Sequence, residues 1–353
     1  MMKEIAVEKN IKRYEAYKDS GVEWLGEIPE HWETKKFKFV LDQSKGLTIT
    51  KQNLINEGIF CVNYGEIHSK FGFELDTTKH KLKCVGEEYL ISDSNSLLNK
   101  GDFVFADTSE DIEGSGNFTH LRSSDKTFAG YHTVIARPKI KIESLFLAFV
   151  FDSTSFRNQI RKKVKGVKVY SITQSVLKET NVWIPPLQEQ TKIAQFLDDK
   201  TTKIDEAIAI KDQQIQLLKE RKQILIHNAV TKGIRSLSEV EMKDSGVEWI
   251  GEIPVGWEVK KLKYLLNEKL KYGANESGID YDIDLPRYVR ITDFGNDGKL
   301  SEKNKLSLSW KNGGDYLLKD GDILFARSGA TVGKTYQFKK SMSVEDNYCF
   351  EAS

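Results

Sequence analysis

A dense run of cations lies near the middle of the chain, at residues 157–168, with the sequence RNQIRKKVKGVK. It holds no acidic residue, and its six cations are Arg157, Arg161, Lys162, Lys163, Lys165 and Lys168. A helix end that runs into a glycine turn and carries this charge is suited to bind the phosphates of DNA. The next residues add hydroxyl and amide groups for phosphates or base edges, namely Tyr170, Ser171, Thr173 and Gln174. A solvated charged face is the alternative, but this density of cations in a chain of net charge +1 favours DNA contact.

A second stretch, SGATVGKT at residues 328–335, resembles a phosphate-binding loop without matching it. That loop requires glycine at its first position, where this chain has Ser328, and a helix must follow. Residues 336–338, Tyr-Gln-Phe, instead have the composition of a strand. The stretch therefore predicts a β-hairpin loop from which Arg327 and Lys334 project, and both are further candidates for DNA contact.

The other polar residues form no set that would predict catalysis or a metal site. The six histidines lack the spacing of metal ligands. The acidic cluster at residues 107–113, DTSEDIE, lacks the paired lysine motif that a metal-dependent nuclease would need. No nucleophile elbow, dinucleotide-binding fingerprint or methyltransferase glycine motif is found. We therefore expect a non-catalytic chain that binds no cofactor or metal itself.

Composition predicts an ordinary soluble protein of two or more domains. The 353 residues are 39% hydrophobic and 30% charged, and the net charge of +1 means that any basic surface must be local. No apolar run approaches the roughly 20 residues of a membrane helix, and residues 1–5 lack a signal-peptide core. Three scattered cysteines, Cys61, Cys84 and Cys349, are typical of thiols in a reducing compartment. A cytoplasmic location is therefore expected.

An internal duplication organises the elements that must position these residues. Residues 18–41 and 243–266 are identical at 17 of 24 positions, at an offset of 225. Both copies carry two tryptophans and an Ile-Pro pair around a glycine turn. The repeated segment could cover the core of its own domain, or it could form two equivalent surfaces that bind the same partner. The near-verbatim recurrence favours the second interpretation and predicts two large modules, each opened by this segment.

Weaker sequence similarities between the two modules follow the repeated segment. Residues 100–106, KGDFVFA, recur as DGDILFA at 320–326. Residues 60–63 and 287–290 each predict a short strand before an acidic turn, and residues 344–350 are expected at the place of 130–136. Segments that share a pattern but differ in their other side chains predict one fold that has two different binding specificities.

Between the modules the hydrophobic period becomes helical, from residue 187 to about 231. One row of positions at heptad spacing is Leu197, Ile204, Lys211, Leu218 and Leu225, and the interleaved row is Thr201, Ile208, Ile215, Lys222 and Ala229. This spacing predicts one long helix with a coiled-coil stripe, which starts after Pro186 and stops at Gly233. The expected pairing surface consists of Leu197, Ile204, Ile208, Ile215, Leu218 and Leu225. An amphipathic helix packed on a globular core is the alternative.

The modules themselves are expected to be strand-rich with some helix, so the predicted fold class is α+β. Short β-branched and aromatic runs predict strands at residues 103–105, 133–136, 182–184 and 323–325. A helix is predicted at residues 143–163. The predicted division of the chain is an N-terminal segment (1–31), a first recognition domain (32–184), a long central helix (185–235), a repeated segment (236–256) and a partial second domain (257–353).

Three pieces of the chain resemble the specificity subunit of type I restriction-modification enzymes. The first is the segment at residues 17–32, YKDSGVEWLGEIPEHW, which returns from residue 243. The second is VWIPPLQEQTKIAQFLD at residues 182–198, and the third is the helix that ends in AVTKG at residues 229–233. Together they extend over nearly the whole chain, and the middle piece is highly specific.

The resemblance implies that each of two target-recognition domains reads one half of a split DNA target, while the helix sets the distance between them. It also implies modification (methyltransferase) subunits, which carry S-adenosylmethionine and methylate a flipped adenine. A restriction subunit, a motor-nuclease that uses ATP and magnesium, completes such a complex in the prokaryotic cytoplasm. None of that catalysis maps to residues of this chain.

The second module departs from the family pattern. Residues 32–185 span about 150 residues in the first module, whereas residues 257–353 number 97, without counterparts of helix 143–163, the basic run or a second long helix. The sequence therefore predicts a truncated second recognition domain. Two copies could then pair, each supplying the helix that the other lacks. An assembly or anti-restriction protein that binds modification subunits without reading DNA, and a stand-alone restriction nuclease, are alternatives.

Overall fold

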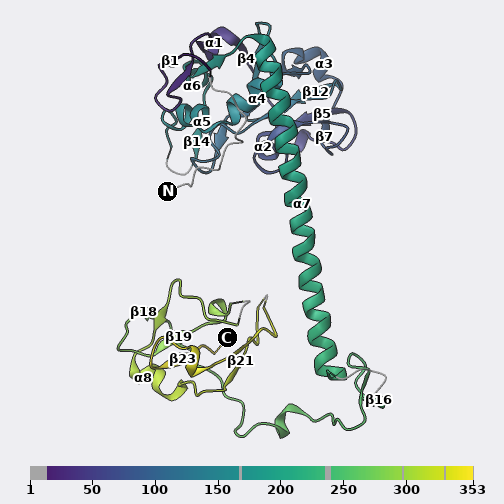
Figure 1. Cartoon of the computed structure of the whole chain (residues 1–353), viewed down its shortest axis with the longest axis vertical. Coiled ribbons are helices and arrows are strands. Elements are labelled where there is room, and N and C mark those ends of the chain that lie inside the picture. Colours follow the sequence, from purple (N-terminus) through teal and green to yellow (C-terminus); the bar gives the residue numbers. More distant parts are fainter. Residues whose placement is uncertain (1–13, 167–168, 235–239, 296–297, 330, 353) are drawn as a thin grey trace. The chain divides into compact units, whose positions relative to one another are not determined.

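The computed structural model describes residues 14–166, 169–234, 240–295, 298–329 and 331–352. The chain divides into two compact units, residues 1–220 and 221–353 (Figure 1). Mixed sheets, short helices and one long helix make up the described chain, so the predicted α+β class is confirmed. None of the helices in the described ranges combines the length and apolar character that crossing a membrane requires.

The larger sheet of the first unit has five strands in the order β4-β13-β9-β11-β6. Only β11 and β6 pair in parallel, and the other neighbours are antiparallel. The strands predicted at 103–105 and 133–136 are confirmed, because they lie in β9 and β13, which pair with each other in this sheet. The bounds are β4 Leu41–Lys45, β6 Phe73–Leu75, β9 Phe103–Ala106, β11 Phe118–Leu121 and β13 Thr133–Pro138.

A second, four-stranded sheet has the order β7-β5-β12-β8. Its central strands β5 and β12 pair in parallel, and the outer two pairs are antiparallel. Cys61 and Cys84 are free thiols buried at this sheet. The bounds are β5 Ile59–Val62, β7 Lys83–Val85, β8 Leu97–Leu98 and β12 Thr127–Ala129.

Two helices, α4 (Ser144–Asp152) and α5 (Thr154–Arg161), occupy the region where the sequence predicts one helix at 143–163. That prediction is wrong at Ser153, whose φ of −64° and ψ of 145° are extended rather than helical. The Ser153 hydroxyl accepts a hydrogen bond from the backbone N–H of Phe156 and so starts a new helix. Both helices pack on the larger sheet through a buried aromatic cluster of Phe37, Phe103, Phe105, Phe118, Phe151 and Phe156.

The two ends of the first module meet in one short sheet. Strand β3 (Glu33–Lys36) pairs antiparallel with β15 (Asn181–Ile184), which confirms the strand predicted at 182–184. The remaining elements of this unit are β1 Tyr17–Asp19, β2 Glu27–Pro29, β10 Thr108–Ser109, β14 Tyr170–Ser171, α1 Phe37–Val40, α2 Tyr64–Ser69, α3 Tyr89–Ser92, α6 Gln174–Lys178 and the 3-10 turns Lys51–Asn53 and Ser94–Ser96.

The long helix α7 runs from Leu187 to Lys232, which confirms the helix predicted from residue 187 to about 231. Its 46 residues correspond to a length of about 69 Å. Every residue from 201 to 230 is exposed, so this part of the helix is not packed on a globular core. Exposed fractions on the predicted pairing surface are 58% for Ile204, 54% for Ile208, 48% for Ile215, 62% for Leu218 and 58% for Leu225, while Leu197 is half-buried.

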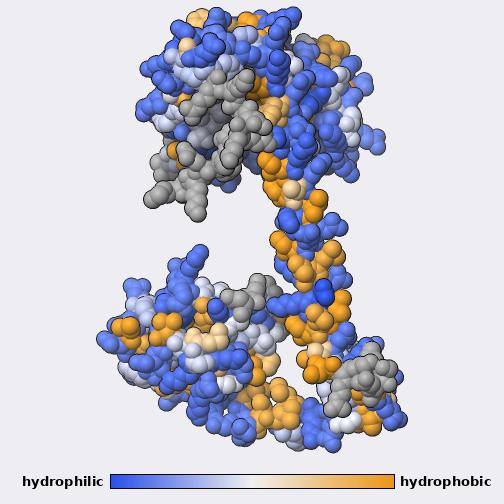
Figure 2. Space-filling model, in the orientation of Figure 1, coloured by the Kyte–Doolittle hydropathy of each residue, from blue (hydrophilic) through white to orange (hydrophobic). Residues whose placement is uncertain are grey.

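Figure 2 shows apolar side chains over the exposed length of α7. Exposed apolar residues on a helix at heptad spacing are typical of a surface that a second helix covers. The predicted pairing residues are therefore available for a partner, and whether they bind one stays a prediction.

The second unit contains a four-stranded sheet in the order β18-β20-β19-β23 and a separate hairpin, β21-β22. The hairpin joins residues 323–325 to 335–337, so the predicted strand at 323–325 and the predicted β-hairpin loop at 328–335 are both confirmed. The bounds are β16 Met242–Asp244, β17 Glu252–Pro254, β18 Ile279–Asp280, β19 Arg287–Val289, β20 Leu306–Ser307, β21 Ile323–Phe325, β22 Thr335–Gln337, β23 Tyr348–Phe350, α8 Trp310–Gly313 and the 3-10 turns Leu262–Tyr264, Ile291–Asp293, Gly314–Tyr316 and Lys340–Met342.

The duplication seen in the sequence is also present in the strand pairing. β1 pairs with β2 as β16 pairs with β17, with Tyr17 opposite Pro29 and Met242 opposite Pro254. β5 pairs in parallel with β12 as β19 pairs with β23. β23 therefore corresponds to β12, and the expected match of residues 344–350 to 130–136 is wrong. The parallel pairing sets this register, and short runs of similar composition could not show it.

Candidate nucleic-acid interface

Two arginines of the predicted basic run hold α5 to neighbouring segments. The Arg157 guanidinium forms an ion pair with Asp152 at 2.9 Å and donates a hydrogen bond of 2.8 Å to Oδ1 of Asn117. The Arg161 guanidinium donates to the carbonyl oxygen of Glu113 at 2.6 Å. Their charges are therefore partly engaged inside the fold, although both side chains remain partly exposed.

The lysines that follow also have partners within the first unit. Lys162 forms an ion pair of 2.7 Å with Glu23 and lies 5.1 Å from the centre of the Trp24 ring, so it holds the first repeated segment against α5. Lys163 donates a hydrogen bond of 2.9 Å to the carbonyl oxygen of Glu179. Burial, together with the nearby charge of Lys36, lowers the pKa of Lys163.

One described cation of the run, Lys165, is exposed and has no side-chain partner among the residues that the structure describes. Lys168 lies outside the described residues. Four of the five described cations thus stabilise the fold, which sequence reasoning did not foresee. Phosphate binding by this run stays a prediction, and Lys165 is the residue on which it can be tested without disturbing internal contacts.

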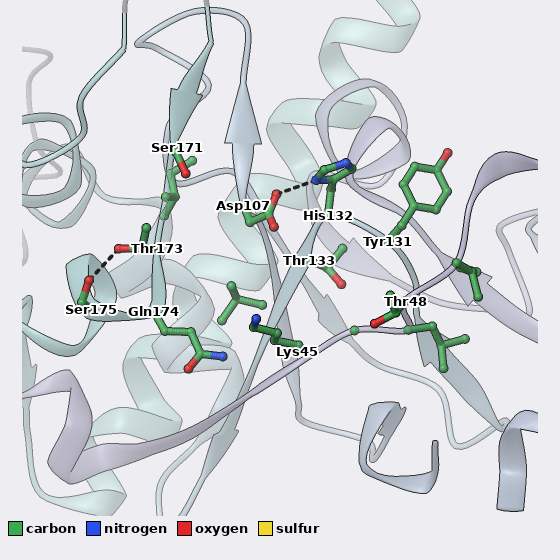
Figure 3. Close-up of a pocket in the computed structure, with 15 residues that line it drawn as sticks. Lys45, Thr48, Asp107, Tyr131, His132, Thr133, Ser171, Thr173, Gln174 and Ser175 are labelled. Carbon is green, nitrogen blue, oxygen red and sulfur yellow. Dashed lines mark hydrogen bonds and ion pairs between the residues drawn. The ribbon is translucent and has the colours of Figure 1, made fainter. Parts of the chain in front are cut away.

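A polar hollow of about 570 Å³ lies beside this run in the first unit (Figure 3). We define it by residues 45–49, 107, 131–134 and 171–175. Of the predicted residues it includes Ser171, Thr173 and Gln174, and Tyr170 immediately precedes this set. Sequence reasoning missed the other polar side chains that line it, namely Lys45, Thr48, Tyr131, His132, Thr133 and Ser175, and it considered Asp107 only as part of an acidic cluster.

Backbone contacts hold four distant segments together around the polar hollow. The N–H of Leu47 donates to the carbonyl oxygen of Ala129 at 2.8 Å, and the N–H of Ile172 donates to that of Asp107 at 2.7 Å. At Gly46, a Cβ atom would lie only 2.1 Å from the carbonyl oxygen of Gly130, so this close approach requires glycine. Thr173 then caps α6, since its hydroxyl accepts a hydrogen bond from the N–H of Val176.

The side chains of the polar hollow combine donors and acceptors. Asp107 pairs with His132 at 3.2 Å, and His132 adopts a φ of +55°, which is uncommon for a residue with a Cβ atom. Lys45, Thr48 and Gln174 have no side-chain hydrogen bond within the described ranges. Figure 3 shows Lys45, Gln174 and the Asp107–His132 pair lining the same space. Amide, ammonium and carboxylate groups in an open polar hollow can read the hydrogen-bonding edges of DNA bases.

No group of three or more potential metal ligands occurs among the residues with described positions.

The two cations predicted in the second unit lie at the ends of the β21-β22 hairpin. The Arg327 guanidinium lies 4.9 Å from the centre of the Tyr272 ring, and its Nε donates to the carbonyl oxygen of Ala352 at 2.7 Å. Lys334 donates to the carbonyl oxygen of Phe294. Lys334 is thus engaged within the fold, whereas Arg327 is exposed and held in a defined orientation.

The repeated segments are fastened near the ends of α7. In the first unit Glu189 accepts hydrogen bonds from the Trp32 indole at 3.0 Å and the Tyr14 hydroxyl at 3.0 Å, and it lies 2.8 Å from Nε2 of His31. Burial opposes the charged form of Glu189, but the hydrogen bonds from these three side chains outweigh it and lower its pKa. In the second unit the ring of Trp257, the counterpart of Trp32, lies against Gly233, just after α7.

Comparison with known proteins agrees with these features. Residues 29–220, more than half of the chain, match the family model described as type I restriction modification DNA specificity domain. The chain is 28% identical over 286 residues to a Methanocaldococcus jannaschii protein with the provisional name type I restriction enzyme MjaX specificity subunit, covering 77% of this chain and 62% of that protein. It is 27% identical over 317 residues to the type I restriction enzyme EcoKI specificity subunit of Escherichia coli strain K12, covering 87% of this chain and 63% of that protein.

The chain thus spans less than two thirds of the length of these two relatives. Among solved structures, the HsdS subunit from Thermoanaerobacter tengcongensis aligns with a TM-score of 0.43 and 17% identity, covering 92% of this chain and 74% of its own. Because the family model matches more than half of its residues, the chain belongs to the type I restriction-modification DNA specificity family.

Proposed function

We propose that this chain is the DNA-reading subunit of a type I restriction-modification complex and that its first unit recognises one half of a bipartite target. The observation that carries the proposal is the match of residues 29–220 to the DNA specificity domain, a range that includes the polar hollow and most of its surrounding fold. Lys165 is proposed to contact phosphate, while the side chains of the polar hollow contact bases. Phosphate contacts orient such a reader, and base contacts determine its sequence preference.

The partners follow from membership of the family. Modification subunits would bind α7 and the repeated segments and would supply S-adenosylmethionine and the methyl transfer. A restriction subunit would add ATP-driven translocation and cleavage. The exposed apolar side chains of α7 support this assignment, because an exposed helical stripe of this length requires a protein partner to be covered.

Pairing of two copies through α7 is part of the same proposal. Within one chain, the first repeated segment contacts α7 near the start of the helix, where Trp32 binds Glu189. Trp257 of the second repeated segment lies against Gly233, just after the end of the helix. If two α7 helices pair antiparallel, the start of each lies beside the end of the other. One repeated segment could then contact two helices at once, which supports an antiparallel homodimer.

The direct test is co-expression of the chain with its modification subunits in cells, followed by sequencing of the methylated genome. We expect methylated adenines within one bipartite motif. In vitro, the purified complex should shift a duplex that contains this motif and should bind scrambled duplexes more weakly. Equal affinity for all duplexes would favour a subunit that assembles modification subunits without reading DNA, and cleavage by the chain alone with magnesium would favour a nuclease.

A further inference from the structure

The backbone has the same local conformation before strand β9 in the first unit and before strand β21 in the second. We call this common structure, which includes residues 100–106 and 320–326, the backbone frame. The glycines that precede these strands have matching left-handed conformations, with φ of +95° at Gly101 and +90° at Gly321. The next residue is aspartate in both units, and each carboxylate accepts a backbone N–H three residues earlier at 2.8 Å. The first residue after this shared frame is Asp107 in the first unit and Arg327 in the second.

A second part of the backbone frame is the loop at residues 45–47 in the first unit and 272–274 in the second. Leu47 donates its N–H to Ala129 at the end of β12, and Ala274 donates to Phe350 at the end of β23, both at 2.8 Å. The preceding residue is glycine in each case, and a Cβ atom would lie 2.1 Å from a carbonyl oxygen at Gly46 and 2.3 Å from one at Gly273. The residue before that glycine is Lys45 in the first unit and Tyr272 in the second.

The position after the strand and the position before the loop glycine therefore have different side chains in the two units. We call these two positions together the corner of each unit. Glycine and aspartate are retained where the backbone needs them, but Asp107 is replaced by Arg327 and Lys45 by Tyr272. A residue with a purely structural role would be retained together with its frame. Inversion of charge at one solvent-accessible position of a common fold is instead what two readers of different bases require.

The geometry of Arg327 fits a specific base. Stacking on Tyr272 at 4.9 Å and the hydrogen bond from Nε to Ala352 restrict the guanidinium plane. Its two terminal nitrogens have no hydrogen-bond partner within the described part of the unit. A restricted guanidinium with two free, parallel donors matches the O6 and N7 acceptors of guanine in the major groove.

The geometry of Asp107 fits the opposite polarity. One carboxylate oxygen is held by His132 at 3.2 Å, and the other has no hydrogen-bond partner within the described ranges. The Asp107 side chain is 34% exposed at the polar hollow. A carboxylate in this position accepts a hydrogen bond from the exocyclic amino group of cytosine.

From this correspondence we propose that Arg327 and Asp107 are specificity-determining residues at the equivalent corner of the two units, with Arg327 reading a guanine and Asp107 a cytosine. The inference rests on the proposed function, in that it assumes a chain that reads DNA. It adds which side chains set the preference and which bases they select.

The experiment uses the complex of the full chain with its modification subunits and a duplex that carries the methylated motif. Each guanine is replaced singly by 7-deazaguanine, which lacks the N7 acceptor. For the unmodified chain, one such replacement should weaken binding roughly 10- to 100-fold. Arg327→Ala should weaken binding to the native duplex by a similar factor and should be insensitive to that same replacement.

Two further variants sharpen the test. Arg327→Lys retains the charge without the planar fork, and we expect it to respond to 7-deazaguanine as Arg327→Ala does. Asp107→Ala, which removes both acceptor oxygens, should become insensitive to replacement of one cytosine by pyrimidin-2-one, which lacks the amino group. Lys311→Ala, an exposed cation elsewhere in the second unit, is the control and should behave like the unmodified chain.

Failure of the inference is distinguishable from failure of the proposed function. If the unmodified complex prefers its motif but the Arg327 and Asp107 variants respond to every analogue as it does, the inference is overturned and the function stands. The same holds if Arg327→Ala weakens all duplexes equally and lowers the salt dependence, which would identify a phosphate contact. Absence of any sequence preference in the unmodified complex would overturn the proposed function itself.

Discussion

The indole nitrogen of Trp32 donates a hydrogen bond of 3.0 Å to Oε2 of Glu189, which joins the first repeated segment to the first turn of α7. The two residues are separated by 157 positions in the sequence. The same carboxylate also binds Tyr14 and His31, so one acidic side chain fastens three aromatic rings. This contact connects the reading domain to the long helix, and its loss should affect both.

Replacing Glu189 with alanine should destabilise the first unit by about 2 kcal/mol, because the half-buried indole N–H of Trp32 would lose its acceptor. Glu189→Gln retains an acceptor oxygen and should retain most of the stability. Chemical denaturation of the full chain measures both variants. Glu220→Ala, on the exposed part of α7, is the control. Equal unfolding midpoints for all these variants would show that the contact does not stabilise the fold.

The Gly46→Ala variant tests the backbone frame of the polar hollow. The added methyl group would lie 2.1 Å from the carbonyl oxygen of Gly130, so the loop must move away from β12. We expect a loss of about 2 kcal/mol of stability and weaker binding of the target duplex. The matched control is Gly65→Ala, since a Cβ atom there meets no other atom within 4 Å. Similar melting temperatures for the two variants would contradict this account.

Lys165→Ala tests the phosphate contact of the basic run. Loss of one phosphate contact should lower the slope of log affinity against log salt by roughly 0.9. Replacing Arg161, Lys162 and Lys163 together would also weaken DNA binding, but it would remove the Lys162–Glu23 ion pair and so loosen the first repeated segment. Lys141→Ala, an exposed lysine outside the run, is the control. An unchanged slope for Lys165→Ala would place this lysine on a solvated face.

The pairing surface of α7 can be tested by charge. Ile208→Glu and Leu218→Lys place a charge on the apolar stripe, at side chains that are 54% and 62% exposed in the single chain. The folding of one chain should therefore change little, whereas association with a second α7 or with modification subunits should be lost. Sedimentation of the chain with and without modification subunits measures this. Gln213→Lys, off the stripe, should associate normally, and association of the stripe variants at full strength would exclude this surface.

Acid should destabilise the first unit through His120. This side chain is 3% exposed and stacks on Phe103, and neither ring nitrogen has a hydrogen-bond partner among the residues whose positions are described. Burial, with smaller contributions from the charges of Arg122 and Lys100, lowers the pKa of His120 to about 3. In the unfolded chain the pKa returns to about 6.5, so the unfolded state binds the extra proton between these values.

The stabilising contribution of neutral His120 is therefore complete above pH 6.5 and declines as the pH falls toward 3, by on the order of 4 kcal/mol. The His120→Phe variant retains the stacking without the titration, and its stability should depend less on pH over this range. Denaturation curves at several pH values compare the two proteins. Parallel pH profiles would show that His120 does not govern acid sensitivity.

Local patterns in the sequence were sufficient for several features. The helix of residues 187–231, the hairpin around residues 328–335 and the strand at 103–105 were all predicted, because each depends on short-range periodicity or turn chemistry. The duplication was equally evident, since identity at 17 of 24 positions needs no folding to detect. The break at Ser153 was missed, because the apolar pattern continues across it while the cap interrupts the helix.

Only the tertiary structure decided where the functional groups meet. Lys45, Asp107, His132 and Gln174 come from four separate parts of the chain, and nothing in their local sequence marks them as neighbours. The basic run likewise showed its charge but not its partners, since the residue that binds Lys162 is Glu23, 139 positions away. Strand register, which corrected the place of residues 344–350, is also set by pairing between distant segments. The sequence by itself thus determined the family, the long helix and the repeat, whereas the corner of each unit, with Asp107 in the first and Arg327 in the second, exists only because packing brings distant strands together.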